Sequence, residues 1–597
     1  MSVYTAPVAE MEFVLNELAD LRGVSELPGF EEATPDLVRA VLEEAGKLAG
    51  EVLAPLNQSG DQQGARVNDG QVQTPDGWIE AYRTFVDAGW NSLGFDPQYG
   101  GQGLPWLLSS AIQEMWSSSN LAFGLCPLLT QGAVHALQLH GSKAQRDTYL
   151  PNLVSGEWTG TMNLTEPQAG SDLGAVRTRA ERDGDHYRIT GQKIFITYGE
   201  HDLTENIIHL VLARLSDAPA GVKGISLFIV PKHLVNADGT LGARNDVRCV
   251  SLEHKLGIHA SPTAVMSYGD NDGAIGFLVG EENRGLEYMF SMMNLARHSV
   301  GLQGVGIAEM AYQQARDFAA QRVQGRVLGA RDGDRTTINN HPDVRRMLMS
   351  MRARTEAIRA LNYYTGAVFD KAQRTGDEGE RQRQQALLDL LIPIAKGWTT
   401  ELGVDIASLG IQVHGGMGYM EETGAAQVLR DSRITPIYEG TTGIQAGDLI
   451  GRKILRDGGA VLDEFLNQMR SLDNELGAAT DASLQRIRAA LDDGIDAVAQ
   501  AKDWLLEAAG RDPRLPAAAS VPMLHLFGTV TGGWLMARAA LAARRKLDAN
   551  EGDRDFYQAK IATAEFFASH ELPQSQGHLR AIRDGSEVTL ALAAEQL

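Results

Sequence analysis

The stretch Val176–Thr197, VRTRAERDGDHYRITGQKIFIT, decides the fold. Its central Asp183-Gly184 separates VRTRAER from HYRITGQKIFIT, and an Asp-Gly pair favours a tight hairpin turn because both residues tolerate positive φ angles. Two further runs, IIHLVLA at 207–213 and ISLFIV at 225–230, are short, β-branched and bounded by turn residues. We therefore expect a mostly antiparallel β domain in this part of the chain.

The sequence on both sides of this segment has helical periodicity instead. Apolar residues recur at three-to-four spacing in the first 150 residues, and the same spacing resumes near Gly285. Near the end, prolines 513, 516 and 522 predict a loop before the helix that carries Leu535 and Ala539. We therefore predict a mainly α protein with a central β domain, divided into a helical domain at 1–155, a β domain at 156–284, a helical domain at 285–456 and an additional helical domain at 457–597.

Composition limits the compartment and the partners. The formal net charge is −22, which disfavours binding to nucleic-acid phosphates and to anionic lipid. Cys126 and Cys249 are the two cysteines, which argues against a disulfide framework. No basic residue precedes Arg22, and no uninterrupted apolar run reaches the roughly 20 residues of a membrane span. We expect a cytoplasmic protein without stable membrane insertion.

Several common site motifs are incomplete. The glycines at 304 and 306 lack the third glycine of a nicotinamide-binding fingerprint and lie in a helical stretch. His254 and His259 are better explained as loop or surface residues than as metal ligands, and there is no HExxH or paired CxxC motif. We expect no metal site.

Three stretches carry the candidate chemistry. They are MNLTEPQAGSD at 162–172, GQKIFIT at 191–197 and PIYEGTTGIQ at 436–445. Taken singly, each has a plain structural interpretation, namely a polar turn, a strand, and a helix whose first turn is capped by Thr441 or Thr442. Their combined order and spacing are a more specific signal.

Together these stretches resemble the acyl-CoA dehydrogenase family over nearly the whole chain. The resemblance implies a helical N-terminal domain, a β-barrel-like middle domain and a four-helix C-terminal domain, with FAD held between domains and across a subunit interface. The chain is most similar to the long form with an added C-terminal helical domain. MSVYTAPVAEMEF, MNLTEPQAGSD, VSLEHKLGIHASPTAVMSY and MMNLAR resemble the 3-methylthiopropanoyl-CoA dehydrogenase subgroup.

The resemblance also implies the cofactor contacts. Residues 162–171 match the segment that wraps the flavin, and 195–197 match a Trp-Ile-Thr segment beside its rings, with phenylalanine replacing tryptophan. Thr197 is expected to hydrogen-bond flavin N5, and Arg322 to reach the FAD pyrophosphate of a neighbouring subunit. The expected cofactor-binding residues are Met162, Leu164, Thr165, Ser171, Phe195, Ile196, Thr197, Arg322, Gln324, Gln412, Gly415, Gly416 and Thr441.

The resemblance makes Glu439 the catalytic base. A carboxylate in a dry pocket is a stronger base than in water, and the amide N–H of Glu439 can donate to the thioester oxygen. Some relatives place the base just before the residue that matches Arg297, but here that position is Ala296, which cannot accept a proton. The expected substrate-binding residues are Ser171, Asn294, Arg297 and Gly440, with Asn294 standing where relatives often have aspartate.

The expected activity is FAD-dependent α,β-dehydrogenation of an acyl-CoA thioester to the trans-2-enoyl-CoA. The resemblance implies that electrons pass to electron-transfer flavoprotein and that the protein is a homo-oligomer, a dimer or a dimer of dimers. The expected substrate is 3-methylthiopropanoyl-CoA or a related short- or medium-chain acyl-CoA. The alternatives are a medium- or long-chain fatty acyl-CoA dehydrogenase of β-oxidation and an acyl-CoA oxidase that uses O₂. A DNA-binding role and an inactive scaffold are disfavoured by the acidic charge and by the presence of the base.

Overall fold

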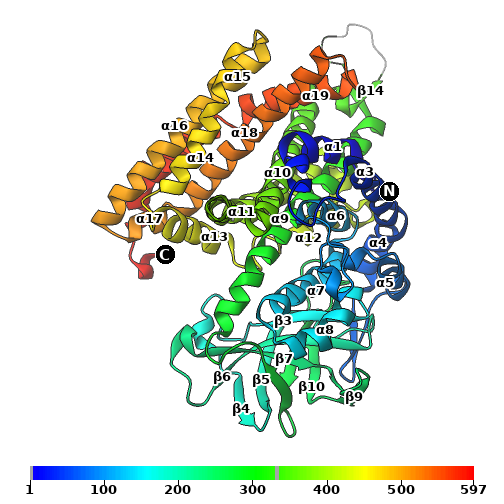
Figure 1. The fold of residues 1–597 in the computed structure, drawn as a ribbon. Helices are drawn as coiled ribbons and strands as arrows, with labels where there is room; N and C mark the ends of the chain where they lie inside the picture. The colour runs from blue at the N-terminus through cyan, green and yellow to red at the C-terminus, as the bar shows by residue number, and fades with distance from the viewer. Residues whose placement is uncertain (1–3, 328, 330–334) are drawn as a thin grey trace. The chain divides into compact units, whose positions relative to one another are not determined.

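The computed structural model describes residues 4–327, 329 and 335–597. The chain forms two compact units (Figure 1). Residues 45–104 and 119–299 form one unit, here called the β unit, and the remaining segments form the other, here called the helical unit. The predicted class, mainly α with a central β domain, is confirmed.

The β unit is built around a barrel-like sheet. β5 (His186–Thr197) pairs with β12 (Ala274–Leu278), which pairs with β7 (Ile225–Pro231). β7 pairs with β6 (Asn206–Leu215), β6 with β4 (Arg179–Asp183), and β4 again with β5. These five strands therefore close into a ring, which satisfies backbone groups that an open sheet would leave at its edges.

Three more strands extend this sheet. β3 (Trp158–Asn163) runs parallel to β6, while β11 (Thr263–Tyr268) pairs antiparallel with β5 and with β10 (Val247–Leu252). The pairing is mostly antiparallel, as expected, with parallel exceptions at β3–β6 and β4–β6.

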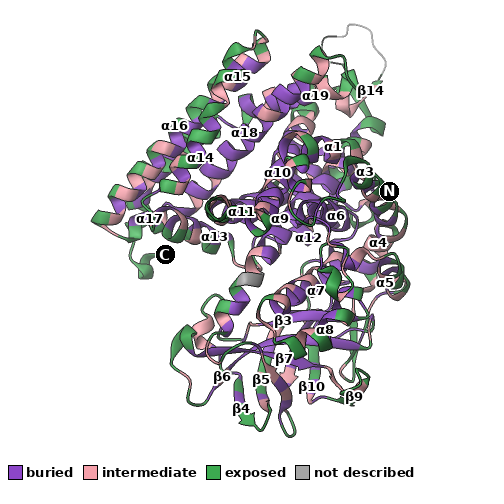
Figure 2. Ribbon diagram, viewed as in Figure 1, coloured by how far each residue is buried: buried purple, intermediate pink, exposed green. Residues whose placement is uncertain are grey.

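The core explains why the central strands are so apolar. All residues of β3 and β7 are buried, and nearly all of β6 (Figure 2). Strands covered on both faces are continuous hydrophobic runs rather than alternating ones. Helices α7 (Leu121–His140) and α8 (Lys143–Ser155) pack against β3 and cover this side of the sheet.

The rest of the β unit contains short elements, including one that the periodicity did not predict. β1 (Arg66–Asn68) and β2 (Gln71–Gln73) form a hairpin within the segment expected to be helical, turning through Asp69 and Gly70 at positive φ. The other elements are β8 (His233–Val235), β9 (Leu241–Arg244), α4 (Ala54–Gln63) and α5 (Trp78–Asp87).

The helical unit is organised by long helices. α10 (Pro342–Arg374) packs along α11 (Glu378–His414), and α12 (Ala425–Ser432) and α13 (Thr442–Asp448) pack on α11. β13 (Val323–Arg326) and β14 (Arg335–Thr337) pair as a small ribbon. The other α-helices of this unit before residue 450 are α1 (Val8–Phe13), α2 (Leu21–Ser25), α3 (Pro35–Leu48), α6 (Trp106–Ser119) and α9 (Gly285–Gln321). Residues 45–48 of α3 and 285–299 of α9 belong to the β unit.

The last part of the chain is a helical layer organised by α18 (Ser520–Asp548). This mostly buried helix packs on α10, α11 and α13 and on the other C-terminal helices (Figures 1 and 2). The loop predicted from the prolines is largely absent, because proline is tolerated in a first helical turn. Pro516 lies in α17 (Arg514–Ala518), and Pro522 in the first turn of α18. The remaining helices are α14 (Ala460–Ser471), α15 (Asp473–Ala478), α16 (Ala482–Arg511), α19 (Arg554–His570) and α20 (Gln574–Thr589).

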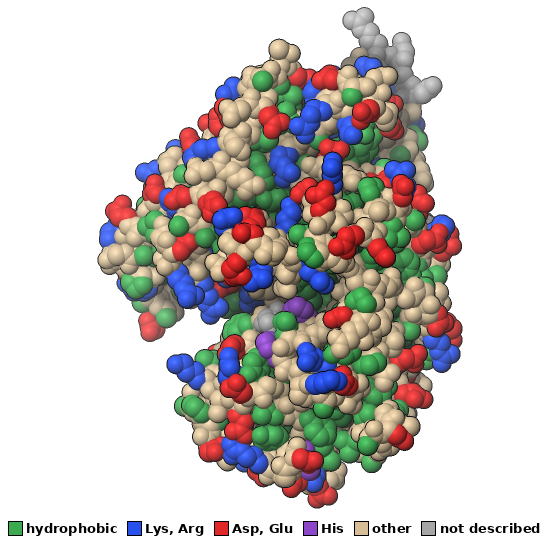
Figure 3. All heavy atoms as spheres, viewed as in Figure 1, with side chains coloured by type: hydrophobic (Ala, Val, Ile, Leu, Met, Phe, Trp, Pro, Cys, Tyr) green, Lys and Arg blue, Asp and Glu red, His purple; other side chains and the backbone are tan. Residues whose placement is uncertain are grey.

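The surface is rich in charge of both signs. Acidic and basic side chains are interspersed on the face seen in Figure 3. Across the described ranges 4–327, 329 and 335–597, no helix is both long enough and apolar enough to span a bilayer.

Candidate active site

The loop between α12 and α13 holds the predicted base in an unusual backbone conformation. Glu439 has φ of 53°, a left-handed value that a non-glycine residue adopts only when its surroundings enforce it. The loop is closed by the Tyr438 amide, which donates to the Ile434 carbonyl at 3.1 Å, and by the Thr442 amide, which donates to the Pro436 carbonyl at 3.0 Å. Glu439 therefore lies at the apex of a tight, ordered turn.

The carbonyls next to the base accept hydrogen bonds from buried side chains. Lys396 Nζ donates to the Gly440 carbonyl at 2.8 Å. Gln445 Nε2 lies 3.3 Å from the Glu439 carbonyl and 3.4 Å from that of Gly440. Lys396 and Gln445 are both fully buried. Two consecutive peptide planes are thus tied to α11 and α13.

The residues on either side of this apex are also anchored. The Tyr438 hydroxyl donates to Gln303 Oε1. Burial, with an added contribution from the nearby Glu439 charge, raises the pKa of Tyr438 well above its usual range, so this hydroxyl keeps its proton. Thr442 donates to Glu401, and Thr441 caps α13 by accepting from the Ile444 amide at 3.3 Å. The cap interpretation of Thr441 is confirmed by this bond.

In the β unit, the predicted flavin-wrapping segment forms a turn around Glu166. The Glu166 and Ala169 backbones exchange hydrogen bonds of 3.0 and 2.9 Å. The Glu166 carboxylate accepts from the Thr178 amide and hydroxyl at 3.0 and 2.6 Å, and from the Arg177 amide at 2.7 Å. The turn is fixed from inside, and its outer residues 170–172 are exposed.

Glu166 also meets a buried lysine from the second motif. Lys193 Nζ donates to Glu166 Oε1 at 2.8 Å and to the Leu164 carbonyl at 3.0 Å. Burial lowers the pKa of Lys193 to about 8. Burial alone would raise the pKa of Glu166, but Lys193, Thr178 and Arg177 together hold it at about 2. Both groups therefore carry charge near neutral pH.

The second motif contains a bulge that turns a large ring outward. Along the β5–β11 pairing, Ile196 opposes Ala264 whereas Lys193 opposes Met266, so two β5 residues face the single residue Val265. Phe195 lies in this bulge with φ of 59°, and 58% of it is exposed. Bulges redirect side chains. Here the bulge presents an aromatic face at the surface of the β unit.

The other predicted residues of the β unit lie on the same two segments or on α9. Met162 and Ile196 are buried, Leu164, Thr165 and Thr197 are half-buried, and Ser171 is exposed. Thr161 Oγ1 donates to the Thr197 carbonyl at 2.8 Å, which links the two segments. On α9, Asn294 is half-buried, while Arg297 and Ala296 are buried.

The remaining predicted residues lie in the helical unit and face solvent. Arg322 and Gln324 are exposed at the start of the β13–β14 ribbon, where the Gln324 carbonyl accepts from His341 Nε2 at 2.7 Å. Gln412 is exposed near the end of α11. At Gly415 and Gly416 an added Cβ would meet no atom within 4 Å, so a ligand can approach their backbone directly.

The structure thus brings the predicted residues together in two sets. Within the β unit, 162–171 and 195–197 are joined by the Lys193 and Thr161 hydrogen bonds. Within the helical unit, Glu439, Gly440 and Thr441 share one loop. In the β unit, the exposed Phe195 ring and the half-buried threonines can contact a planar ring system. In the helical unit, the open backbone at Gly415 and Gly416 can be approached by a polar group. Over the described part of the chain, no group of three or more His, Cys, Asp or Glu side chains is placed to hold a metal ion.

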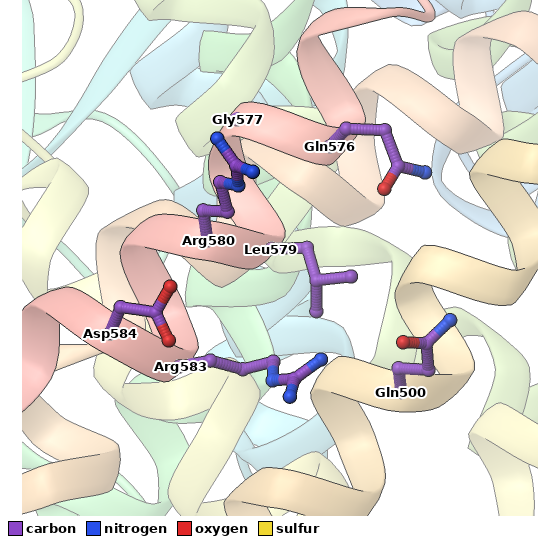
Figure 4. A pocket seen from close by; sticks show the side chains of 7 residues that line it. All are labelled: Gln500, Gln576, Gly577, Leu579, Arg580, Arg583 and Asp584. Carbon is purple, nitrogen blue, oxygen red and sulfur yellow. The ribbon is translucent and has the colours of Figure 1, made fainter.

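A surface pocket of about 450 Å³ lies elsewhere, between α16 and α20 (Figure 4). Arg580 and Arg583 of α20 line it together with Gln500 of α16. It contains none of the predicted site residues.

Sequence reasoning missed the side chains that support the site. Glu166 and Lys193 lie inside quoted motifs, and the single lysine within the strand-forming stretch GQKIFIT was a usable signal. Lys396 lies in the apolar run IPIAKGW, where an isolated lysine suggests a buried hydrogen-bonding role. Gln445 closes the third motif and had no assigned contact.

Comparisons with known proteins cover almost the whole chain. Family models match residues 36–157 (acyl-CoA dehydrogenase, N-terminal domain), 161–270 (middle domain), 283–455 (C-terminal domain) and 464–593 (acetyl-CoA dehydrogenase C-terminal like). The 3-methylmercaptopropionyl-CoA dehydrogenase of Ruegeria pomeroyi is 50% identical over 98% of this chain and 99% of its own length. A butyryl-CoA dehydrogenase of Syntrophomonas wolfei is 34% identical over 97% of each chain.

A solved structure shares the fold. The acyl-CoA dehydrogenase of Bacillus anthracis complexed with FAD is 21% identical and has a TM-score of 0.74, covering 98% of this chain and 93% of its own.

Proposed function

The chain belongs to the acyl-CoA dehydrogenase family, and on that premise we propose that it oxidises 3-methylthiopropanoyl-CoA or a related short- or medium-chain acyl-CoA to the trans-2-enoyl-CoA. The observation that carries the substrate proposal is the 50% identity to a 3-methylmercaptopropionyl-CoA dehydrogenase, over 98% of this chain and 99% of that relative. 3-Methylmercaptopropionyl-CoA and 3-methylthiopropanoyl-CoA are two names for one thioester. Two relatives at 34% and 33% identity are named butyryl-CoA dehydrogenases, and one at 35% identity is named a broad-specificity linear acyl-CoA dehydrogenase. The preference for a short acyl chain therefore rests on the 50% match.

The family is FAD-dependent, and FAD supplies an acceptor for the hydride that leaves the β-carbon. Phe195, exposed by the β5 bulge, is suited to lie against the flavin rings, and Thr197 to hydrogen-bond their edge. We propose that the exposed Ser171 and the half-buried Thr165, both on the turn around Glu166, contact the flavin or the CoA chain. The open backbone at Gly415 and Gly416, with Arg322, suits the phosphate and adenosine portion.

Glu439 would remove the α-proton as the β-hydride departs. The α-proton is acidified by the thioester, so a carboxylate is a sufficient base once it is held in place and shielded from water. We propose that the amide N–H of Glu439 turns to the thioester oxygen of the bound substrate and stabilises the developing enolate, since such a donor is worth about 3 kcal/mol. The left-handed backbone of Glu439 supports this role, because conformational strain in an ordered protein concentrates at functional positions.

The electrons are proposed to pass on to electron-transfer flavoprotein, and the protein to be a dimer or a dimer of dimers in which Arg322 serves the neighbouring subunit. We also propose that the boundaries between the four domains lie near residues 155, 284 and 456 in the sequence. The decisive experiment is anaerobic mixing of the FAD-loaded protein with acyl-CoAs from propanoyl to palmitoyl and with 3-methylthiopropanoyl-CoA. Fast flavin bleaching by 3-methylthiopropanoyl-CoA and by short chains is expected. Bleaching by long chains alone would reject the substrate proposal, and rapid peroxide formation in air would indicate an oxidase.

A further inference from the structure

We propose that Lys396 and Gln445 are positioning residues that hold the base, and that α18 of the C-terminal layer presses them into place. The inference rests on the proposed function, because it concerns how Glu439 is set for proton removal. All the contacts that carry it lie within the helical unit.

The first step is the grip on the backbone. The Gly440 carbonyl accepts from Lys396 Nζ at 2.8 Å, and Gln445 Nε2 lies within 3.4 Å of both the Glu439 and the Gly440 carbonyls. Fixing two successive carbonyls fixes the two peptide planes on the C-terminal side of Glu439. Those planes set the orientation of the Gly440 and Thr441 amides and restrict the rotation of the backbone at Glu439.

The second step is the need for such a grip. Glu439 has φ of 53°, Gly440 has φ of 92°, and a glutamate in the left-handed region relaxes if nothing holds it. Lys396 and Gln445 together are here called the clamp. Replacing Gly440 by a larger residue would displace Gln445, because a Cβ at position 440 would come within 2.7 Å of Gln445 Nε2. The loop and the clamp are therefore fitted to each other.

The third step is the burial of the clamp itself. Lys396 and Gln445 are each fully buried, and burying an ammonium group is unfavourable unless it makes strong hydrogen bonds. Within the part of the chain that the structure describes, Gln445 Oε1 has no hydrogen-bond partner although it is buried. An arrangement with these penalties is more readily explained by a role in the site than by stability alone.

The last step is the support from α18. A Cβ at Gly397, next to Lys396, would lie 3.0 Å from Leu524 of α18 and 3.3 Å from Gln445 Cβ. One turn further, Gly528 of α18 meets the Trp398 ring so closely that a Cβ there would be 2.4 Å away. Leu524 and Trp398 are buried. The added C-terminal layer thus packs directly behind the residues that grip the base loop.

The test measures the single-turnover rate of flavin reduction at saturating acyl-CoA in FAD-loaded wild type, Lys396→Met and Leu524→Ala. Misplacing a reacting group by about 1 Å costs about 100-fold in rate. We expect Lys396→Met to lower the rate by roughly that factor and Leu524→Ala to lower it by about tenfold. The acyl-CoA dissociation constant and the FAD content should stay near wild type. The isotope effect with α-deuterated substrate should rise, because proton removal then limits the step.

Matched controls separate positioning from stability. Lys560→Met removes another buried lysine of the helical unit, and Leu484→Ala truncates another fully buried leucine of the C-terminal layer. Both should lower the melting temperature while leaving the rate and the α-isotope effect of the folded fraction unchanged. Where Lys396→Met fails to fold, Gln445→Met and Leu524→Ala decide by the same two measurements.

Failure of the proposed function and failure of the positioning role give different results. If wild type itself reduces no flavin with any acyl-CoA, the proposed function fails. If wild type is active and the clamp variants match it in rate and isotope effect, or if the controls lose as much as the clamp variants, the positioning role fails alone.

Discussion

The ammonium nitrogen of Lys193 lies 2.8 Å from Oε1 of Glu166, and both side chains are buried inside the β unit. The same nitrogen donates to the Leu164 carbonyl, so one lysine on β5 holds both the side chain and the backbone of the neighbouring turn. The bulge formed by Ile194 and Phe195 follows directly along β5. The two segments expected to face the flavin are thus joined by an ion pair that faces the interior.

Breaking this pair is expected to release FAD. Lys193→Met leaves the Glu166 carboxylate buried without its cation, which typically costs about 3–5 kcal/mol. The ratio of flavin to protein absorbance should fall, along with the melting temperature. The double variant Lys193→Met/Glu166→Gln should recover part of both losses because it removes the uncompensated charge. Lys143→Met, at an exposed ion pair, is the control and should have little effect.

Replacing the base is expected to separate cofactor binding from chemistry. Glu439→Gln keeps the size and the hydrogen-bonding capacity of the side chain and loses only its basicity. The variant should bind FAD as wild type does and remain yellow when mixed anaerobically with 3-methylthiopropanoyl-CoA. Bleaching at the wild-type rate would remove Glu439 from the mechanism.

The strands of the β unit were predictable because their signal is local. Runs such as 207–213 and 225–230 are apolar along their whole length, and they form β6 and β7. The hairpin at 66–73 was missed because strands of three residues leave too short a pattern to distinguish from a loop. The loop predicted from the prolines was wrong because proline disrupts the interior of a helix but not its first turn, and Pro522 lies in the first turn of α18.

The supporting contacts of the site could not be predicted in the same way. Glu166 and Lys193 are 27 positions apart, and Lys396 and Gly440 are 44 apart, so their pairing depends on the tertiary fold. The motifs located the loops, whereas the residues that hold those loops lie on other elements. The three-dimensional structure is needed to show that Lys396 of α11 binds the base loop and that α18 packs on α11.

Stability should depend on pH through Asp370. Its carboxylate accepts from the amides of Trp106 and Leu107 at the start of α6, at 2.9 and 2.8 Å. Burial raises the pKa of Asp370 from 3.8 to about 7, although these amides partly oppose the shift. Between pH 4 and 7 the folded state therefore keeps a proton that the unfolded state releases, so this group's contribution to the unfolding free energy falls as pH rises.

Asp370→Asn removes this titration. The unfolding free energy of the variant minus that of wild type should therefore increase between pH 4 and pH 7, by an amount on the order of a few kcal/mol. The difference in melting temperature should increase with it. Calorimetry of both proteins at several pH values measures the difference. A constant difference across this window, or one that decreases, would contradict the assignment.

Arg322 is expected to matter for cofactor binding and assembly together. Its side chain is exposed, while its backbone is fixed by a bond from the Ile338 amide to its carbonyl, so alanine should not disturb the ribbon. Arg322→Ala should lose FAD and subunit association, measured by absorbance and light scattering. Arg326→Ala, at an exposed arginine at the end of β13, is the matched control and should retain both. A flavin-loaded oligomer of Arg322→Ala would overturn the expectation.

Truncation after Gly458 is expected to prevent the helical unit from folding. Lys560 of α19 is buried and donates to Glu10 and Glu356 at 2.7 and 2.8 Å, so its removal leaves Glu10 buried without its cation and leaves Glu356 with Arg352 alone. Loss of α18 also uncovers Trp398, a large ring that packs against Gly528 and Gly532. These losses exceed what a domain of ordinary stability, about 5–15 kcal/mol, can tolerate. The fragment should therefore be recovered as aggregate or without cooperative unfolding, and a monodisperse, flavin-loaded, active product would show that the C-terminal layer is dispensable.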